Sequence, residues 1–284
     1  MLYSDAVMQT KSSRPVALVT GASAGIGAAT VRALLATHIV YAGARRVDRM
    51  AELAKAGAHV IELDVTDDAS NVTAIERIRA ESGRLDVLVN NAGYGSYGAI
   101  EDVPASEARR QFDVNIFGAA RLIQLALPVM REQRSGKIIN VSSMGGKMYE
   151  PFGGWYHATK FALEGLSDCL RLEVAPFGID VVIIEPGGIK TEWGAIAVQS
   201  LLDRSATGAY GKAATAWSKV LHEGNASGSA PSVISDAILV AVMARKPKTR
   251  YVAGNFARPI LTLRWLLPDR AFDSVMRSVG RRYA

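Results

Sequence analysis

The chain of 284 residues is 49% hydrophobic and 21% charged, which is ordinary for a folded globular protein with a sizeable core. It has 33 Lys and Arg against 27 Asp and Glu, a net charge of +6, yet neither zinc-ligand spacing nor interleaved aromatic and basic residues point to a nucleic-acid module. The single cysteine, Cys169, excludes an intrachain disulfide and a cysteine metal cluster, and we expect it to be a small core residue.

The first residues of the chain, 1–14, lack the apolar core of a signal peptide, so we expect a flexible leader followed by one domain over 15–284. No apolar run approaches the ~20 residues that a membrane-spanning helix needs. We therefore expect no integral membrane segment, no nucleic-acid partner, no metal site and, by default, a cytoplasmic location.

Short apolar runs alternate with helical patterns through most of the chain. Apolar runs of this kind, buried on both faces, are typical of parallel strands, and we expect them at 15–20, 38–44, 58–63, 85–91, 137–142, 179–186 and 249–254. The helices between them are expected at 25–36, 48–56, 68–82, 105–133 and 155–177. This alternation predicts the α/β class, with a doubly wound (Rossmann) parallel sheet of seven strands and helices on both faces. Ligands of such sheets bind at the carboxyl ends of the strands.

The rhythm changes after residue 190. Residues 191–230 are rich in Ala, Ser, Gly and Thr, and we expect a partly helical lid or substrate loop there. Pro231 can open a helix, and a C-terminal helical extension is expected at about 257–284, packed on the edge of the domain.

A glycine-rich turn, TGASAGIG, follows the first strand and leads into a helix. Glycine permits a tight turn and close approach of the backbone to phosphate, and the helix N-terminus offers unpaired N–H donors. The turn therefore predicts a dinucleotide site that includes Gly21, Ser23, Gly25, Ile26 and Gly27. A glycine turn needed only for packing is the alternative.

The second strand ends in Ala44-Arg45-Arg46, where a fold that prefers NAD would carry an acid for the ribose hydroxyls. Guanidinium groups instead offer forked donors to a phosphate. Arg45 and Arg46, with the Ser23 hydroxyl, therefore predict NADP(H) rather than NAD(H). Two solvated arginines are the alternative.

The next two strands end in polar loops. After the third, Asp64 can accept from the adenine amino group and Val65 can pack on the ring. The alternative role of Asp64 is to cap the following helix, which Thr66 or Asp67 suits equally well. After the fourth, in NNAG, Asn91 can brace neighbouring loops, while Ala92 and Gly93 let a cofactor approach.

The stretch SMGGKMYEPFGGWYHATK brings together Ser143, Tyr156 and Lys160. Tyr156 and Lys160 lie at positions i and i+4, on one face of a helix. A nearby ammonium lowers the pKa of a phenol, whose ordinary value is about 10, and a tyrosine tuned in this way can exchange a proton with an alcohol or ketone oxygen. An ordinary helix start with a solvated lysine is the alternative.

In this order, TGASAGIG, NNAG, Asn115, Ser143 and YHATK resemble the short-chain dehydrogenase/reductase family, in its compact branch. GARR and YHATKFALEGL look closest to the 17β-hydroxysteroid dehydrogenase-like and retinol dehydrogenase-like subgroup. The resemblance implies that Ser143 binds the substrate oxygen, that Tyr156 is the general acid/base, and that Lys160 binds the nicotinamide ribose. It further implies that Asn115 holds a water, that a homodimer or homotetramer forms through the long helices, and that the nicotinamide end is held by Pro186, Gly187, Ile189 and Thr191.

The predicted function is NADP(H)-dependent hydride transfer between the nicotinamide and a carbonyl or alcohol. Apolar residues of the segment after Thr191, such as Trp193 and Ile196, together with Trp217, favour a hydrophobic small-molecule substrate. A non-catalytic NADP sensor or scaffold on the same fold is the alternative, and dehydration or epimerisation at the same site is another.

Overall fold

The structure, a computed structural model, describes residues 13–283. Its centre is a sheet of seven parallel strands in the order β3-β2-β1-β4-β5-β6-β7, which confirms the predicted α/β doubly wound fold. The order reverses between β1 and β4, and ligands bind at such a switch point in doubly wound sheets. The strands are β1 Val16–Thr20, β2 Ile39–Ala44, β3 His59–Glu62, β4 Val87–Asn90, β5 Gly136–Val141, β6 Ile179–Pro186 and β7 Arg250–Ala253.

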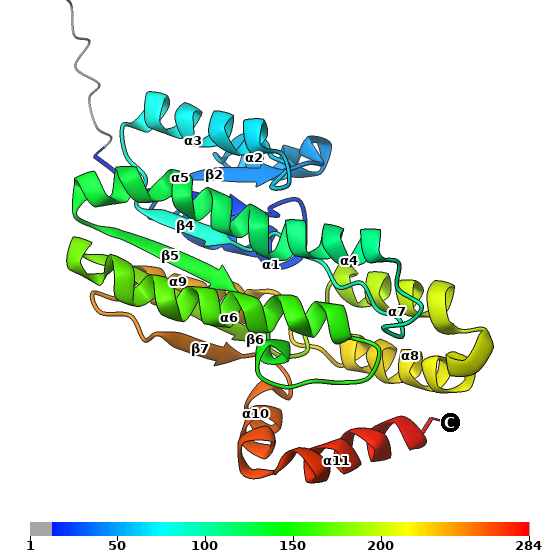
Figure 1. Ribbon diagram of the computed structural model, residues 1–284. Helices are drawn as coiled ribbons and strands as arrows, with labels where there is room; N and C mark the ends of the chain where they lie inside the picture. The colour runs from blue at the N-terminus through cyan, green and yellow to red at the C-terminus, as the bar shows by residue number, and fades with distance from the viewer. Residues whose placement is uncertain (1–12, 284) are drawn as a thin grey trace, which may run out of the picture.

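Helices cover both faces of this sheet (Figure 1). One face carries α1 (Gly25–Leu34), the short η1 (Val47–Met50) and α2 (Ala51–Lys55), and α9 (Ser232–Met243). The other carries α3 (Asp68–Ser82), α5 (Gly118–Gln133) and α6 (Gly154–Val174), which is followed by η4 (Ala175–Phe177). Alternate residues of β1 enter the two cores, with Ala17 and Val19 on the α1 side and Val16 and Leu18 on the α3 side.

The helix predicted over 105–133 is interrupted. It consists of α4 (Ala105–Phe112), a π-helical turn η2 (Asp113–Phe117) and α5. By length and hydropathy alone this stretch could cross a membrane. In the fold, however, α5 packs against the sheet as a core helix through Leu122, Ile123 and Met130.

The segment expected as a partly helical lid or substrate loop is almost entirely helical. It contains α7 (Glu192–Ser205), the short η5 (Gly208–Tyr210) and α8 (Gly211–Ala226), which pack against each other near the carboxyl edge of the sheet. Buried Leu201 and Trp217 hold them in a third apolar cluster, and this explains why small residues could form regular helices here. The C-terminal extension, α10 (Ala257–Leu266) and α11 (Asp269–Arg281), lies beyond β7, with α11 beside α8 (Figure 1).

Two further expectations have different outcomes. Most of the predicted leader, residues 1–12, lies outside the described residues, but Arg14 is anchored by hydrogen bonds to the carbonyls of Leu35 and His38, both 2.9 Å long. Cys169 is exposed on α6, so its assignment to the core was wrong. Its neighbour Leu170 takes the buried position on that turn.

Candidate active site

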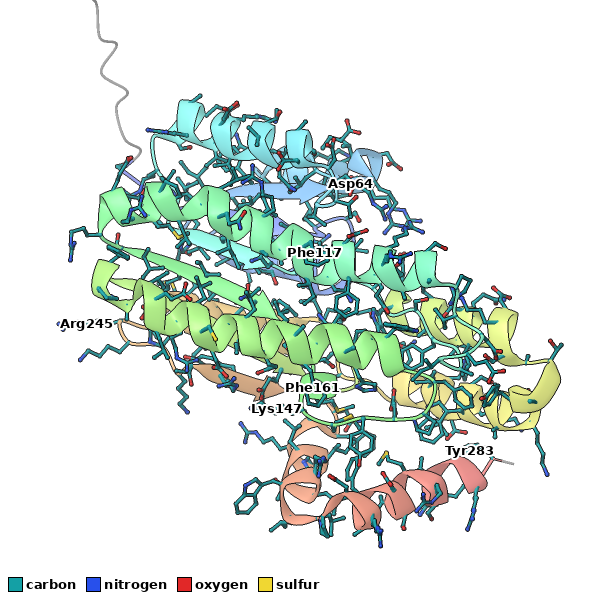
Figure 2. All side chains as sticks on the ribbon, viewed as in Figure 1. Asp64, Phe117, Lys147, Phe161, Arg245 and Tyr283 are labelled. Atoms are coloured by element: carbon teal, nitrogen blue, oxygen red, sulfur yellow. The ribbon has the colours of Figure 1, made fainter. Side chains whose placement is uncertain are left out.

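A cavity of about 1070 Å³ runs along the carboxyl edge of the sheet. Loops after six strands form one wall, while α7, α8 and the C-terminal extension contribute the rest. It reaches from Asp64 after β3 to Tyr283 near the C-terminus, two side chains that lie far apart in Figure 2. Every predicted site residue lines this cavity except Gly27 and Asn115.

The glycine-rich turn forms a bare backbone cradle at one end. Gly21 and Gly25 have φ angles of +64° and +53°, a region that suits glycine. The α1 helix begins at Gly25 without a capping side chain, so its first amides point towards the cavity with no side-chain acceptor. Gly27 lies beneath the turn, where an added Cβ would stand 2.3 Å from the Gly21 carbonyl oxygen. Gly27 therefore allows close packing rather than contact with a ligand.

Thr20 and Asn91 lock this turn to the loop after β4. The Asn91 Nδ2 donates to the Thr20 carbonyl at 2.8 Å, and the Thr20 hydroxyl accepts from the amides of Asn91 and Ala92 at 3.0 and 2.9 Å. This confirms the expected bracing by Asn91. The role of Thr20 was not predicted, because a threonine that ends a strand carries no distinctive signal.

The basic end of the cavity is formed by the exposed Arg45 and Arg46. Arg46 donates to the Ser23 hydroxyl at 3.3 Å, so these two predicted phosphate ligands converge. A carboxylate from α7, Glu192, lies 3.6 Å from Arg46 and 2.9 Å from Arg49. Glu192 was not predicted, and it competes for the same arginine.

Asp64 also faces the basic end. Burial raises the pKa of its carboxyl, but hydrogen bonds from the Thr66 amide and hydroxyl outweigh this and hold the pKa below its usual range. The N-cap of α3 is Asp67, which accepts from the Ala69 amide, so Asp64 does not cap that helix.

Tyr156 and Lys160 are both buried on α6, with 8% and 7% of their surfaces exposed. Burial raises the pKa of Tyr156 to about 12, and the Glu150 carboxylate adds to this rise. A hydrogen bond from Ser143 acts in the opposite direction and lowers the pKa, but by less. Burial likewise lowers the pKa of Lys160 to about 8. The expected fall in the tyrosine pKa is therefore not found in the protein alone. The Lys160 ammonium donates to the Val141 carbonyl at 2.8 Å and lies 5.9 Å from the centre of the Tyr156 ring, so desolvation of the phenol dominates.

Asn115 lies behind the cavity wall, on the π-helical turn. Its Nδ2 donates to the Tyr94 carbonyl and the Thr159 hydroxyl, both at 3.0 Å, and its Oδ1 accepts from the Tyr94 amide at 3.1 Å. A Cβ built on Gly93 would stand 3.1 Å from Asn115 Oδ1 and 3.8 Å from Lys160 Nζ. Asn115 thus orders the Tyr94 backbone and ties it to Thr159 on α6. The water that we expected it to hold stays a prediction.

Aromatic side chains lie around the Tyr156 ring. The ring of Trp193 lies 5.1 Å from the Tyr156 ring and that of Tyr97 lies 6.0 Å from it, measured between centroids. Buried Tyr97 donates to the Glu150 carboxylate at 2.7 Å. The sequence singled out Trp193, but nothing in it distinguished Tyr97 from the other tyrosines.

The loop after β6 closes the far side, with Pro186, Gly187, Ile189 and Thr191 along the cavity wall. A Cβ on Gly187 would stand 2.2 Å from the Asn255 carbonyl oxygen, so glycine is needed there for packing. Thr191 reaches the glycine-rich turn, its Cγ2 lying 3.2 Å from where a Gly25 Cβ would be. In residues 13–283, no group of His, Cys, Asp and Glu is arranged to hold a metal ion.

Comparisons with known proteins agree with this arrangement. Residues 15–200 match the short chain dehydrogenase family. A probable short-chain type dehydrogenase/reductase of Helicobacter pylori, VdlC, is 35% identical over 270 residues, which cover 94% of this chain and 99% of that one. An NADPH-dependent 3-dehydrocapnine reductase of Ornithobacterium rhinotracheale is 34% identical over 270 residues, 91% of this chain and 95% of the relative.

Among solved structures, a short-chain dehydrogenase from Streptomyces avermitilis superposes with a TM-score of 0.76 at 34% identity, covering 96% of this chain and 100% of that chain. The match extends over the sheet, the cradle and the tyrosine helix described above. The chain therefore belongs to the short-chain dehydrogenase/reductase family, and it is an oxidoreductase that uses a nicotinamide dinucleotide.

Proposed function

We propose that this protein is an NADP(H)-dependent oxidoreductase that interconverts a hydrophobic ketone or aldehyde and the corresponding alcohol. One observation carries the proposal. Ser143, Tyr156 and Lys160 meet inside a cavity that joins a phosphate-type cradle to an apolar, aromatic chamber.

The cavity fits a dinucleotide. The Gly21–Gly25 turn leaves backbone amides uncovered at the α1 N-terminus, which suits a pyrophosphate, and Asp64 and Val65 border the place for an adenine. Lys160 and the loop after β6 are the groups that would hold the ribose and carboxamide of the nicotinamide. When bound, the nicotinamide donates or accepts the hydride.

The protein's own groups manage the proton. In the reducing direction, Ser143 donates a hydrogen bond to the substrate carbonyl oxygen and Tyr156 transfers its phenolic proton to that oxygen. The raised pKa of Tyr156 keeps it protonated at neutral pH and ready to act as an acid. For alcohol oxidation the phenol must ionise, and a cationic Lys160 beside the bound ligands favours that charge.

The preference for NADP(H) rests on the basic end. Arg45, Arg46 and Ser23 form a polar corner without an acid on β2 or the residues that follow it directly, and the Ornithobacterium relative is described as NADPH-dependent. Guanidinium groups bind phosphate oxygens with paired hydrogen bonds.

The preference for an apolar substrate rests on the third cluster. Trp193, Trp217, Val220, Leu221, Met276 and Val279 pack around the Tyr156 side of the cavity. This supports the finer assignment to the hydroxysteroid- and retinol-dehydrogenase-like subgroup, which we include in the proposal.

We also propose a homodimer or homotetramer. Phe117 and Phe161, 60% and 45% exposed, lie on neighbouring helices of one face (Figure 2), and an α5–α6 interface would cover them.

The test is turnover. Purified protein is mixed with NADPH and a panel of steroid, retinoid, long-chain and short-chain ketones, and loss of reduced nicotinamide is compared with alcohol formed. We expect stoichiometric conversion, fastest with the apolar ketones. Tight NADPH binding without turnover on any compound would instead favour the sensor or scaffold reading.

A further inference from the structure

The C-terminal extension, defined here as α10 and α11, carries apolar side chains that are hardly buried. Of its residues only Ala257 and Phe272 are fully covered. Trp265 is 83% exposed and Leu266 62%, and Phe256 just before α10 is 54% exposed. Trp265 is the most exposed large apolar side chain in residues 13–283, and a bare indole beside a leucine costs free energy in water unless something covers it.

The same extension carries unbalanced positive charge. Its two acids are occupied, because Asp269 accepts from Arg264 at 2.7 Å and Asp273 accepts from the Tyr149 hydroxyl at 2.9 Å. Four exposed arginines of the extension form no ion pair with any residue in 13–283: Arg258, Arg270, Arg277 and Arg281. The same is true of Arg282, directly after α11.

These arginines are placed on the outside. Arg270, Arg277 and Arg281 follow at intervals of seven and four residues, so they share one face of α11. The opposite face holds Phe272 and Met276, which point to the protein. Figure 1 shows α10 and α11 projecting below β7 and α6, away from the helices that cover the two faces of the sheet.

We propose that the C-terminal extension docks on an anionic lipid bilayer. Trp265 and Leu266 enter the headgroup region, where tryptophan is favoured, and the unpaired arginines contact lipid phosphates. Charge selects this occupant over a second copy of the chain. Around a two-fold axis this surface would meet the same surface of the other copy, so two sets of unpaired arginines would come close together, and such like-charge contacts are costly.

Docking would bring the bilayer to the cavity. Ile260 of α10 and Met276 and Val279 of α11 are part of the cavity wall, so an apolar compound could pass from lipid to Tyr156 along an apolar path. This passage rests on the proposed function, whereas the docking itself does not.

The experiment measures co-sedimentation of the full chain with vesicles of phosphatidylcholine alone or mixed with phosphatidylglycerol. Two double variants change the surface. One combines Trp265→Ala with Leu266→Ala, and the other combines Arg277→Gln with Arg281→Gln. None of these four residues lines the cavity. Matched controls are Val240→Ala with Met243→Ala, each 57% exposed on α9, and Arg245→Gln with Lys246→Gln, at the amino edge of the sheet. Turnover on a soluble short-chain ketone checks the site separately.

We expect binding only to the anionic vesicles, weakened by salt, and a loss on the order of tenfold for each surface variant. The control variants should bind like wild type, and all variants should keep their turnover on the soluble ketone. Equal binding of wild type and both surface variants would overturn the proposal. The proposal would also be overturned if the protein did not bind vesicles but formed an oligomer, and if the double variant Trp265→Ala with Leu266→Ala dissociated that oligomer. Such a result would assign this face to a second copy of the chain. Loss of all turnover with vesicle binding intact would count against the proposed function alone.

Discussion

Lys160→Met should make the protein more stable while removing its activity. The pKa of Lys160 falls from 10.5 to about 8 on folding, chiefly through burial, with Glu164 opposing the fall. At ~1.4 kcal/mol for each pKa unit, holding the ammonium in this site costs about 3 kcal/mol at neutral pH. The substitution also removes the donor to the Val141 carbonyl, a loss of roughly 1–2 kcal/mol. The net gain should be ~1–2 kcal/mol in the free energy of unfolding.

The pH dependence identifies the cause. Below about pH 8 Lys160 is charged in both states and its full cost is present. Between about pH 8 and 10.5 the folded state loses this proton while the unfolded state keeps it, so wild-type stability rises with pH. The advantage of Lys160→Met should therefore shrink across this window.

Urea unfolding at about pH 7 and about pH 10 measures the difference. The exposed Lys212→Met serves as the control and should stay within about 0.5 kcal/mol of wild type at both values. A Lys160→Met protein less stable than wild type at the lower pH, or an advantage that does not shrink, would refute this reasoning.

Four further changes test the site. Glu150→Gln should lower the pKa of Tyr156, because the Glu150 carboxylate opposes ionisation of the phenol. The rise in the rate of alcohol oxidation at alkaline pH should therefore move to lower pH. An unchanged pH–rate profile would show that Glu150 does not affect the ionisation of Tyr156. Arg45→Ala should weaken NADPH binding roughly tenfold and leave NADH binding nearly unchanged. Glu192→Gln, which removes the carboxylate 3.6 Å from Arg46, should strengthen NADPH binding a few-fold. Calorimetric titration of the Arg45 and Glu192 variants with NADPH and with NADH measures both effects. An unchanged ratio of the NADPH and NADH dissociation constants would refute the phosphate site. Gly27→Ala should lower the free energy of unfolding by ~1–3 kcal/mol or more in urea, because its Cβ would stand 2.3 Å from a carbonyl oxygen. A loss below this range would contradict that packing.

Most of the fold could be predicted because parallel strands buried on both faces are short apolar runs with distinct ends. All seven predicted strands agree with the structure to within two residues at each end. Strand ends also locate a ligand edge, which is why nearly every predicted site residue lines one cavity. Gly27 and Asn115 differ because their places depend on what lies behind the cavity wall, in packing that spacing along the chain does not reveal.

The substrate side was less predictable for the same physical reason. Residues 191–230 mix alanine with many Gly, Ser and Thr residues, which favour a helix less, so their helices depend on tertiary burial of Leu201 and Trp217. The contribution of Met276 and Val279, more than 110 residues after Tyr156, depends on where α11 docks on α8. The direction of the Tyr156 pKa could not be read from its spacing to Lys160, because the balance between burial and charge is set by the surrounding chamber.

The central claim is that Tyr156 transfers the proton in an NADPH-dependent reduction. The most direct test compares wild type and Tyr156→Phe for both NADPH affinity and turnover of an apolar ketone. The predicted result is an unchanged NADPH dissociation constant with turnover reduced by about 10²–10⁴-fold, the usual contribution of a positioned general acid. Turnover above about a tenth of wild type, with NADPH still bound, would contradict the claim.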